Sequence, residues 1–397
     1  MRILLVHNSY QAGSSGEYVV FASEKALLES RGHKVVAFER FNDDIQSFPL
    51  WKKISLLWET AWSNESYRQV RQVIRRERPD VVHFHNTLPL ISPSAYYACQ
   101  DEGVPVVQTL HNYRLFCAVG ILMRDERVCE ECLHHGPWRG VRYGCYRGSR
   151  VQTAAVAYMV WSHRRKATWN DQIDAYIALT EFSRRKFIQA GLPANKIVIK
   201  PNFLNEEMPR SSRIGRYAIY LGRLTAYEGV RTLLSAWRDL PDVPLMIVGD
   251  GVLRGELEQT AAKNNLNNVA FLGYQLWERC MELLGEASFL VLPSEHHEGF
   301  PCVIVEAYGL GKPVLSSRLD PLPELIRDGE TGMLFDTGSP GDLAAKALRM
   351  FQDSEQTKRM GNAARAEFEA KYTPGRNYQM LMQIYEAVIS NKKRSVS

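Results

Sequence analysis

The chain has 397 residues, of which 45% are hydrophobic, and its net charge is +5, so it is long enough for two or three domains with sizeable cores. It contains no run of eighteen apolar residues, and Met1–Val6 leads into polar sequence rather than a cleavage site, so we expect neither a transmembrane helix nor a signal peptide. These features favour a cytoplasmic protein, and seven cysteines, an odd number, fit reduced thiols or metal ligands better than a disulfide framework.

The first half of the chain alternates apolar runs with helical patterns, which is typical of a parallel sheet covered by helices. The predicted strands are 1–7, 33–39, 80–85, 104–110, 175–180 and 196–200. The predicted helices are 17–30, 67–77 and 94–102. We therefore predict a Rossmann-like domain over residues 1–201, interrupted by a cysteine-containing excursion at 112–150 and followed by a linker at 202–214.

The second half repeats this pattern over residues 215–373. Its five predicted strands are 217–222, 245–249, 269–273, 289–293 and 313–316. A last helix is predicted from about 374 to 389, because Tyr378, Leu381, Tyr385 and Val388 recur at helical spacing. The segment 374–397 is thus predicted to be a C-terminal helix and a frayed tail. The fold class is α/β, with two doubly wound domains.

The stretch 294–307 places two carboxylates, Glu298 and Glu306, eight positions apart across a predicted strand-to-helix junction. Glu298 follows the strand 289–293, and open α/β sheets bind ligands at the carboxyl ends of their strands. Gly299 allows backbone N–H groups and a helix N-terminus, which opens at Pro301, to approach an anion. This arrangement favours a sugar-nucleotide site, although two glutamates at this spacing are also common as solvated surface residues.

These residues, together with the segments 220–224, 247–251 and 271–273, resemble the retaining glycosyltransferase family 4. The resemblance covers nearly the whole chain. It implies the GT-B fold, in which two Rossmann-like domains face a cleft and the C-terminal helix packs back on the N-terminal domain. It also implies that the first domain binds the acceptor and the second binds a nucleotide diphosphate sugar of the UDP or GDP type.

The resemblance assigns three catalytic residues: Arg223 grips the diphosphate, Glu298 binds the sugar hydroxyls, and His111 touches the donor sugar. Donor binding is assigned to the following residues: Gly13, Gly16, Gly222, Gly249, Tyr274, Gly299, Phe300, Pro301 and Glu306. Alternatives stay open for three of these features: Arg223 could be a surface residue of a loop, 11–17 a plain tight turn, and His111 a capping or core residue. Transfer on one face of the sugar, with the leaving phosphate taking the acceptor proton, is the expected mechanism. We find no Asp-x-Asp motif, and no cofactor is expected for catalysis.

Glu228 departs from the family pattern, which carries a lysine before the glycine that is Gly229 here. A carboxylate beside a diphosphate repels it unless the side chain points away or is protonated. Three interpretations follow: a subgroup with its cation elsewhere, for which Arg254 is the candidate, an attenuated enzyme, or an altered sequence.

Four cysteines, Cys117, Cys129, Cys132 and Cys145, follow the pattern C-x11-C-x2-C-x12-C. Four thiolates at this spacing suit a tetrahedral structural zinc, while free buried thiols are the alternative. Together with the segment 111–117, they resemble a subgroup of the same family that has a four-cysteine insertion.

The window 132–170 has no acidic residue and interleaves arginines with tryptophans and tyrosines. Such a face suits an anionic membrane or a diphosphate-linked acceptor, or it is simply a solvated basic face. Nucleic acid would be attracted too, but we predict no nucleic-acid partner.

The sequence therefore predicts a hexosyltransferase that is cytoplasmic and peripheral on the inner face of the plasma membrane. It would transfer a hexose to a glycolipid or lipid-linked saccharide in bacterial surface polysaccharide or lipopolysaccharide biosynthesis. The alternatives are a soluble transferase with a small acceptor and a nucleotide-binding pseudoenzyme. A dehydrogenase is disfavoured, because neither half has a Gly-x-Gly-x-x-Gly with a downstream acid.

Overall fold

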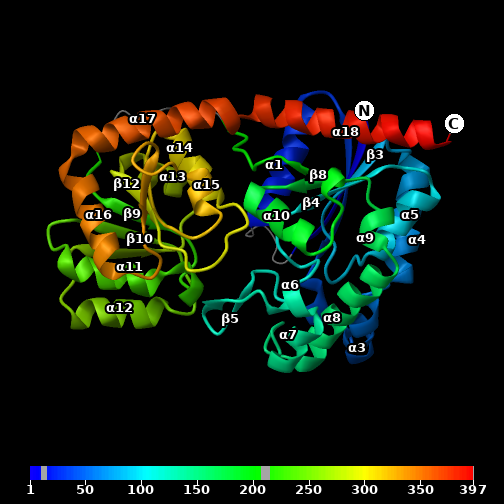
Figure 1. Ribbon diagram of the computed structural model, residues 1–397, viewed down its shortest axis with the longest axis horizontal. Helices are drawn as coiled ribbons and strands as arrows, with labels where there is room; N and C mark the ends of the chain where they lie inside the picture. The colour runs from blue at the N-terminus through cyan, green and yellow to red at the C-terminus, as the bar shows by residue number, and fades with distance from the viewer. Residues whose placement is uncertain (10–15, 207–214, 397) are drawn as a thin grey trace. The chain divides into compact units, whose positions relative to one another are not determined.

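The computed structural model describes residues 1–9, 16–206 and 215–396 (Figure 1). By their internal contacts these residues form two compact units. The first contains Met1–Leu122, Cys129–Asn205 and the C-terminal segment Pro374–Ser397, and the second contains Glu206–Thr373 and the short segment Met123–Val128. Each unit is built on its own six-stranded sheet.

The sheet of the first unit is parallel and has the strand order β2-β1-β3-β4-β7-β8. Its strands are short and mostly buried, as expected for a sheet with helices on its faces. They are β1 (Arg2–Ser9), β2 (Lys34–Phe41), β3 (Val81–Asn86), β4 (Val106–Leu110), β7 (Ala175–Ala178) and β8 (Ile197–Ile199).

Helices and one 3-10 turn surround this sheet. They are α1 (Gly16–Ser30), α2 (Asp44–Ser47), α3 (Leu50–Glu59), α4 (Asn64–Glu77), α5 (Ser94–Asp101), α6 (Glu131–His135), α7 (Trp138–Tyr143), α8 (Arg150–Arg165), α9 (Thr168–Asp171), α10 (Glu181–Gln189), η1 (Ala194–Lys196) and α18 (Pro374–Val396). One apolar cluster joins Leu381 and Tyr385 of α18 to Ile3 and Leu5 of β1. The C-terminal helix therefore packs back on the first unit, as predicted.

The sheet of the second unit is also parallel, with the order β11-β10-β9-β12-β13-β14. Its strands are β9 (Ala218–Leu221), β10 (Leu245–Val248), β11 (Val269–Gly273), β12 (Phe289–Leu292), β13 (Val314–Ser317) and β14 (Gly332–Phe335). The helical segments are η2 (Ala226–Glu228), α11 (Val230–Ala236), η3 (Trp237–Asp239), α12 (Arg254–Lys263), α13 (Trp277–Glu286), α14 (Cys302–Gly309), α15 (Leu322–Leu325), α16 (Pro340–Gln352) and α17 (Ser354–Lys371). The wholly buried Trp237 and Phe289 belong to its core.

The structure differs from the sequence prediction in several places, three of which concern the second sheet, the last helix and the excursion. The second sheet has a sixth strand, β14, which is only four residues long and therefore gives little periodic signal. The last helix continues to Val396, because Lys393 and Arg394 in its final turn are favourable at a helix C-terminus. Within the predicted excursion, the hairpin of β5 (Met123–Arg124) and β6 (Arg127–Val128) belongs to the second unit.

Among the described residues, every helix is either too short or too polar to cross a bilayer.

Candidate active site

The second unit has a topological switch point between its strands β9 and β12. Strand β9 pairs with β10 on one side and with β12 on the other, and the chain order reverses there. Ligands of open α/β sheets bind outside the carboxyl ends of the strands at such a point. Arg223 follows β9, and the segment 294–300 follows β12. The structure therefore brings the predicted residues Arg223 and Glu298 to the site where this fold binds ligands.

Two glycines keep the backbone close at this end of the sheet. Gly249 has a φ of +137°, and a Cβ there would lie 1.9 Å from the carbonyl oxygen of Gly222. Gly229 has a φ of +72°, and its Cβ would lie 1.8 Å from the carbonyl oxygen of Pro293. Larger residues at either position would push the loops after the strands apart. Gly249 was selected from the sequence, whereas Gly229 was noted only as the neighbour of Glu228.

Arg223 presents an exposed side chain on a fixed backbone. The hydroxyl of Tyr220 donates a hydrogen bond to the carbonyl oxygen of Arg223 at 2.7 Å, which holds the start of the loop. The guanidinium lies 5.7 Å from the centre of the Tyr227 ring, and 70% of the side chain is exposed. A guanidinium held in this way is suited to bidentate recognition of a phosphate.

Glu228 lies beside this guanidinium and is buried. Its Oε1 atom lies 3.5 Å from Nη2 of Arg223. Burial, and then the charge of Glu298, raise the pKa of Glu228 to about 7, against the opposing effect of His296 and Arg223. The carboxyl is thus partly protonated at neutral pH. Arg254, the cation suggested from the sequence, instead contacts Asp250 at 3.1 Å and Glu258 at 2.9 Å.

Glu228, His296 and Glu298 form a compact group whose side-chain ligand atoms lie within 4.8 Å of one another. The Oε1 atom of Glu298 accepts a hydrogen bond from the Ser294 hydroxyl at 2.7 Å, and its Oε2 atom lies 3.5 Å from Nε2 of His296. Glu298 is thereby oriented at the end of β12. His296 and Ser294 were not selected from the sequence, because a histidine or serine in a loop carries no signal of its own.

The other predicted donor residues lie around helix α14, except Tyr274, which directly follows β11. Pro301 immediately precedes the helix, after Gly299. Glu306 accepts a hydrogen bond at 3.0 Å from the indole nitrogen of Trp277, and burial raises its pKa. The ring of Phe300 is buried and packs edge-on against Tyr372 at 6.0 Å, so only the backbone of this residue is available to a ligand. Tyr274 is exposed.

In the first unit, the predicted catalytic residue His111 directly follows β4 and is half-buried. Gly13 lies outside the described residues. Gly16 begins α1, and a Cβ there would meet open space, so packing does not require a glycine. The next residue, Glu17, accepts hydrogen bonds from Asn112 at 2.6 Å and from Asn86 at 3.3 Å. Helix α1 is thereby tied to the ends of β3 and β4.

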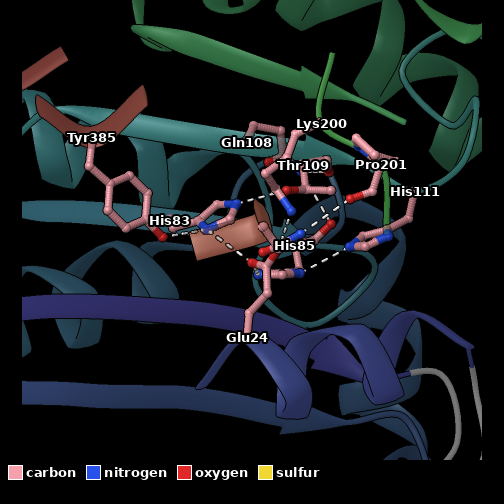
Figure 2. A network of polar contacts seen from close by, with 10 residues as sticks. Glu24, His83, His85, Gln108, Thr109, His111, Lys200, Pro201 and Tyr385 are labelled. Carbon is pink, nitrogen blue, oxygen red and sulfur yellow. Dashed lines mark hydrogen bonds and ion pairs between the residues drawn. The ribbon is translucent and has the colours of Figure 1, made fainter. Parts of the chain in front are cut away.

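A buried polar network lies behind His111 (Figure 2). The Nε2 atom of His111 is 3.0 Å from Nδ1 of His85, and Nε2 of His85 is 3.4 Å from Oε2 of Glu24. Lys200 donates to Oε1 of Glu24 at 2.6 Å. His83, two residues before His85 on the same strand, contacts the Tyr385 hydroxyl at 2.8 Å. Sequence reasoning missed this network, although two histidines at strand spacing in a buried run were a usable signal.

The four cysteines all lie in the first unit and form no disulfide bond. Burial, and then the nearby Cys117, Cys145 and Cys129, raise the pKa of the Cys132 thiol to about 12. The thiols are thus neighbours, but they are not among the described side chains whose ligand atoms lie within 4.8 Å of one another. Four cysteine thiols are suitable zinc ligands, because a thiol that coordinates zinc is deprotonated. The four sulfur atoms nevertheless do not form a compact group in this structure.

Comparison with family models relates both halves of the chain to glycosyltransferases. The model described as Glycosyltransferase Family 4 matches residues 19–208, and the model described as Glycosyl transferases group 1 matches residues 206–367. Among curated relatives, an uncharacterized glycosyltransferase of Methanocaldococcus jannaschii is 30% identical over 48% of this chain and 54% of its own length. N-acetyl-alpha-D-glucosaminyl L-malate synthase of Bacillus anthracis is 25% identical over 81% of this chain and 77% of its own length. The chain spans about half the length of some curated relatives, 54% of the Methanocaldococcus jannaschii protein and 56% of an amylovoran biosynthesis glycosyltransferase of Erwinia amylovora.

Solved structures with the same architecture confirm the predicted GT-B fold. HepE of Anabaena, in complex with UDP, matches with a TM-score of 0.68 at 21% identity and covers 98% of this chain and 100% of that one. Sucrose-phosphate synthase of Thermosynechococcus elongatus matches with a TM-score of 0.71 at 16% identity, over 98% of this chain and 100% of that one. At these identities the likeness concerns the fold alone.

Proposed function

We propose that this chain, a glycosyltransferase with both halves of the GT-B fold, moves a hexose from a UDP- or GDP-type nucleotide sugar to a glycolipid or lipid-linked saccharide, with retention of configuration. The observation that carries the proposal is the exposed guanidinium of Arg223 at the switch point, next to the oriented carboxylate of Glu298. A similar fold in HepE holds UDP in one structure and UDP-glucose in another, which supports this class of donor. The second unit would bind the donor and the first unit the acceptor.

The proposal gives each of these residues of the second unit a role. Arg223 and the backbone N–H groups at the start of α14 would stabilise the departing diphosphate, where negative charge develops. Glu298 would accept hydrogen bonds from sugar hydroxyls, and Glu306 from the ribose. The bond between the sugar carbon and the phosphate oxygen breaks with its electron pair going to the phosphate. The acceptor oxygen attacks the same face, and its proton passes to the leaving phosphate.

The test of this activity is a transfer assay with radiolabelled nucleotide sugars and a lipid-linked saccharide acceptor, followed by NMR of the product anomer. Transfer with retention is expected, together with its loss in Glu298→Gln. An inverted product would contradict the proposed mechanism. Hydrolysis without transfer to any lipid acceptor would favour the alternative, a soluble transferase with a small acceptor.

One observation favours a second candidate, a nucleotide-binding protein without transfer activity. The carboxyl of Glu228 lies 3.5 Å from the guanidinium that is proposed to bind the diphosphate, and it competes for that charge. Nucleotide binding without hydrolysis or transfer would establish this candidate. Activity of the wild-type chain would exclude it.

A surface of the first unit supports the lipid-linked acceptor. Helix α3 exposes Trp51, Ile54 and Trp58, with 69%, 53% and 70% of each residue accessible, and their spacing places them on one face. Helix α3 packs against α8, which exposes Val151 and Tyr158. In Figure 1 these helices lie side by side, with α7 next to them. We define the surface of α3, α7 and α8 as the aromatic-basic face.

The aromatic-basic face combines exposed apolar side chains with positively charged ones. Lysines and arginines lie on the same elements, among them Lys52 and Lys53 of α3 and Arg165 of α8, whose guanidinium lies 5.3 Å from the Trp161 ring centre. An interfacial helix with tryptophans on one side and cations on the other binds anionic membranes. We therefore assign this face to an anionic lipid surface, as a peripheral contact on the cytoplasmic side of a bacterial plasma membrane.

Vesicle flotation tests the lipid contact. The chain is expected to float with vesicles that contain phosphatidylglycerol and to stay behind with phosphatidylcholine alone. The double variant Trp51→Ser/Trp58→Ser should lose flotation, whereas the control Val252→Ser, at an even more exposed apolar residue of the second unit, should not. Equal flotation of all three proteins would overturn the assignment.

Cys117, Cys129, Cys132 and Cys145 are proposed as ligands of a structural zinc in the first unit. Elemental analysis of the purified chain should find one zinc per chain, and Cys132→Ser should reduce it. Full titration of the four thiols by a thiol reagent in the native, metal-free protein would identify them instead as free cysteines.

A further inference from the structure

Four side chains of the first unit form an unbroken polar chain that begins in the core and ends at His111. Lys200 and Glu24 are wholly buried and form an ion pair of 2.6 Å, although they are far apart in the sequence. Glu24 faces His85 at 3.4 Å, and His85 faces His111 at 3.0 Å. Figure 2 shows the side chains in this order, with α1 supplying Glu24 and β3 supplying His85. Each member thus limits where the next can carry its proton.

The contacts indicate which atoms of this row of four side chains carry protons. Glu24 accepts from Lys200 through Oε1, so Oε2 is left facing Nε2 of His85 at 3.4 Å, and neither of these two buried atoms has a hydrogen-bond partner among the described residues. Two lone pairs facing one another away from water are unfavourable, so Nε2 of His85 carries a proton. In a His85 ring that carries this single proton, Nδ1 is an acceptor, and Nε2 of His111 must donate to it. The unprotonated nitrogen of His111 is therefore Nδ1.

The charges around these four side chains favour the same placement of protons. Burial by itself would raise the pKa of Glu24, but Lys200 and His85 bring it well below its ordinary value. Burial, and then His85, lower the pKa values of His111 and His83 well below that of free histidine and the pKa of His7 to about 3. These groups come from β1, β3, β4 and α1, and Tyr385 of α18 contacts His83. The imidazoles of His111, His83 and His7 are therefore neutral beside one balanced ion pair.

We propose that Glu24 and His85 are positioning residues, which present His111 to the substrate as a neutral imidazole with Nδ1 as a hydrogen-bond acceptor. The partner of Nδ1 would be a hydroxyl of the saccharide substrate that the first unit binds, and this part rests on the proposed function. His111 lines a small cavity of about 40 Å³ together with Asn86 and Asn112, so polar groups surround the place where such a hydroxyl could enter.

The first test needs no substrate: nitrogen NMR of the histidine-labelled chain reports which ring nitrogen of His111 carries the proton. The expected result is a proton on Nε2 and none on Nδ1 throughout the neutral pH range. A proton on Nδ1 of His111 in the wild-type chain would overturn the proposal. Because this measurement is made on the free protein, it stands or falls independently of glycosyl transfer.

The second test compares two buried histidines of the same strand. His85→Phe removes the acceptor of His111, whereas the control His83→Phe removes the contacts to Tyr385 and Thr109 and a 3.7 Å approach to Glu24, but no hydrogen bond to His111. His85→Phe should mix the His111 tautomers and lower kcat by about tenfold or more, with a donor KM close to that of the wild type. His83→Phe should keep the tautomer and kcat.

The outcomes of this comparison are distinct. If the His111 tautomer is the same in His85→Phe as in the wild type, the positioning role is wrong. If neither variant folds, the wild-type tautomer still decides between the proposal and its opposite. If the wild-type protein has the expected His111 tautomer but no transfer activity, the positioning role stands and the proposed function is wrong.

Discussion

The two units each gather glutamate and histidine within 4.8 Å, but they treat the charge in opposite ways. In the first unit, Glu24 is wholly buried and neutralised by the ammonium of Lys200. In the second unit, Glu228 and Glu298 are close to one another, and the arginine beside them is exposed. The first group is therefore a fixed element of the fold, whereas the second responds to pH and to an incoming anion. The same residue types serve structure or binding according to whether a buried counter-ion is present.

The largest effect is expected from breaking the buried ion pair. Lys200→Met leaves Glu24 charged and unpaired in the core, which should lower the free energy of unfolding by about 3–5 kcal/mol. Urea denaturation measures the loss. The double variant Glu24→Gln/Lys200→Met should recover much of it, because no charge is then buried alone. A loss well under 1 kcal/mol in the single variant would contradict the fixed role of this group.

The pH dependence of stability sharpens the same point. The pKa of Glu24 is lower in the folded chain than in the unfolded chain. The contribution of Glu24 to stability is therefore present above the pKa that its carboxyl has in the unfolded chain. This contribution is lost as the pH falls through the pKa of the carboxyl in the folded chain. The double variant should lack this part of the acid sensitivity.

Arg223→Ala should leave the fold intact and weaken nucleoside diphosphate binding. Loss of a charge-assisted, bidentate contact is expected to cost about 1.5–3 kcal/mol, or roughly tenfold to hundredfold in the dissociation constant measured by calorimetry. The unfolding free energy should change by less than about 0.5 kcal/mol, because the side chain is exposed. The matched control is Arg238→Ala, at another exposed arginine of the same unit, which should bind as the wild type does. Equal binding by both variants would remove Arg223 from the site.

Glu228 should make donor binding pH-dependent. Its carboxyl ionises as the pH rises through about 7, so the donor diphosphate should bind more weakly at the alkaline end. Glu228→Gln should abolish this slope and tighten binding by roughly tenfold at high pH, which corresponds to about 1.4 kcal/mol. If Glu228→Lys lowers activity without unfolding the chain, the repulsion between this carboxylate and the diphosphate is not the reason for the slope.

Glu228 also affects folding, with the sign opposite to that of Glu24. Its folded-state pKa is raised above the ordinary value, so its contribution to stability is fully present below the unfolded-state pKa and is lost as the pH rises through about 7. The stability advantage of Glu228→Gln over the wild type should therefore grow at alkaline pH. If Glu228→Gln were more stable than the wild type only at acidic pH, the pKa of Glu228 would not be raised in the folded chain.

The smallest effect is expected at the edge of the buried network. Tyr385→Phe removes the 2.8 Å contact between its hydroxyl and Nδ1 of His83 and should lower the unfolding free energy by about 1 kcal/mol. Donor affinity should not change, since the donor is assigned to the other unit. A large loss of donor affinity would show that this network is part of the binding site.

The sequence predicted features that local patterns encode. The apolar run before Pro293, the glycines after the strands and the carboxylates at 298 and 306 are short-range signals, and in the structure Glu298 follows a strand at the switch point of the second sheet. The turn of the last helix toward the first unit came from the family resemblance rather than from its own periodicity. The short strand β14 was missed, because four residues hardly define a period.

The remaining features depend on residues that meet only in the folded chain. The pairing of Glu24 with Lys200 joins α1 to the end of β8, and no spacing in the sequence predicts it. The raised pKa of Glu228 comes from burial and from Glu298, seventy positions away, so the sequence could identify the unusual residue but not its protonation. Helix α3 was missed because its apolar residues face outward, whereas periodicity is ordinarily interpreted as the face that packs on the core.

The most direct test of the donor site is the thermal stabilisation of the chain by UDP, GDP, ADP, CMP and NAD, compared between the wild type and Arg223→Ala. A ligand at a hundred times its dissociation constant adds about 2.7 kcal/mol to the stability of the folded chain. The account predicts a shift of the melting temperature with UDP or GDP that is lost in Arg223→Ala. A shift with NAD alone, or an equal shift in both proteins, would contradict it.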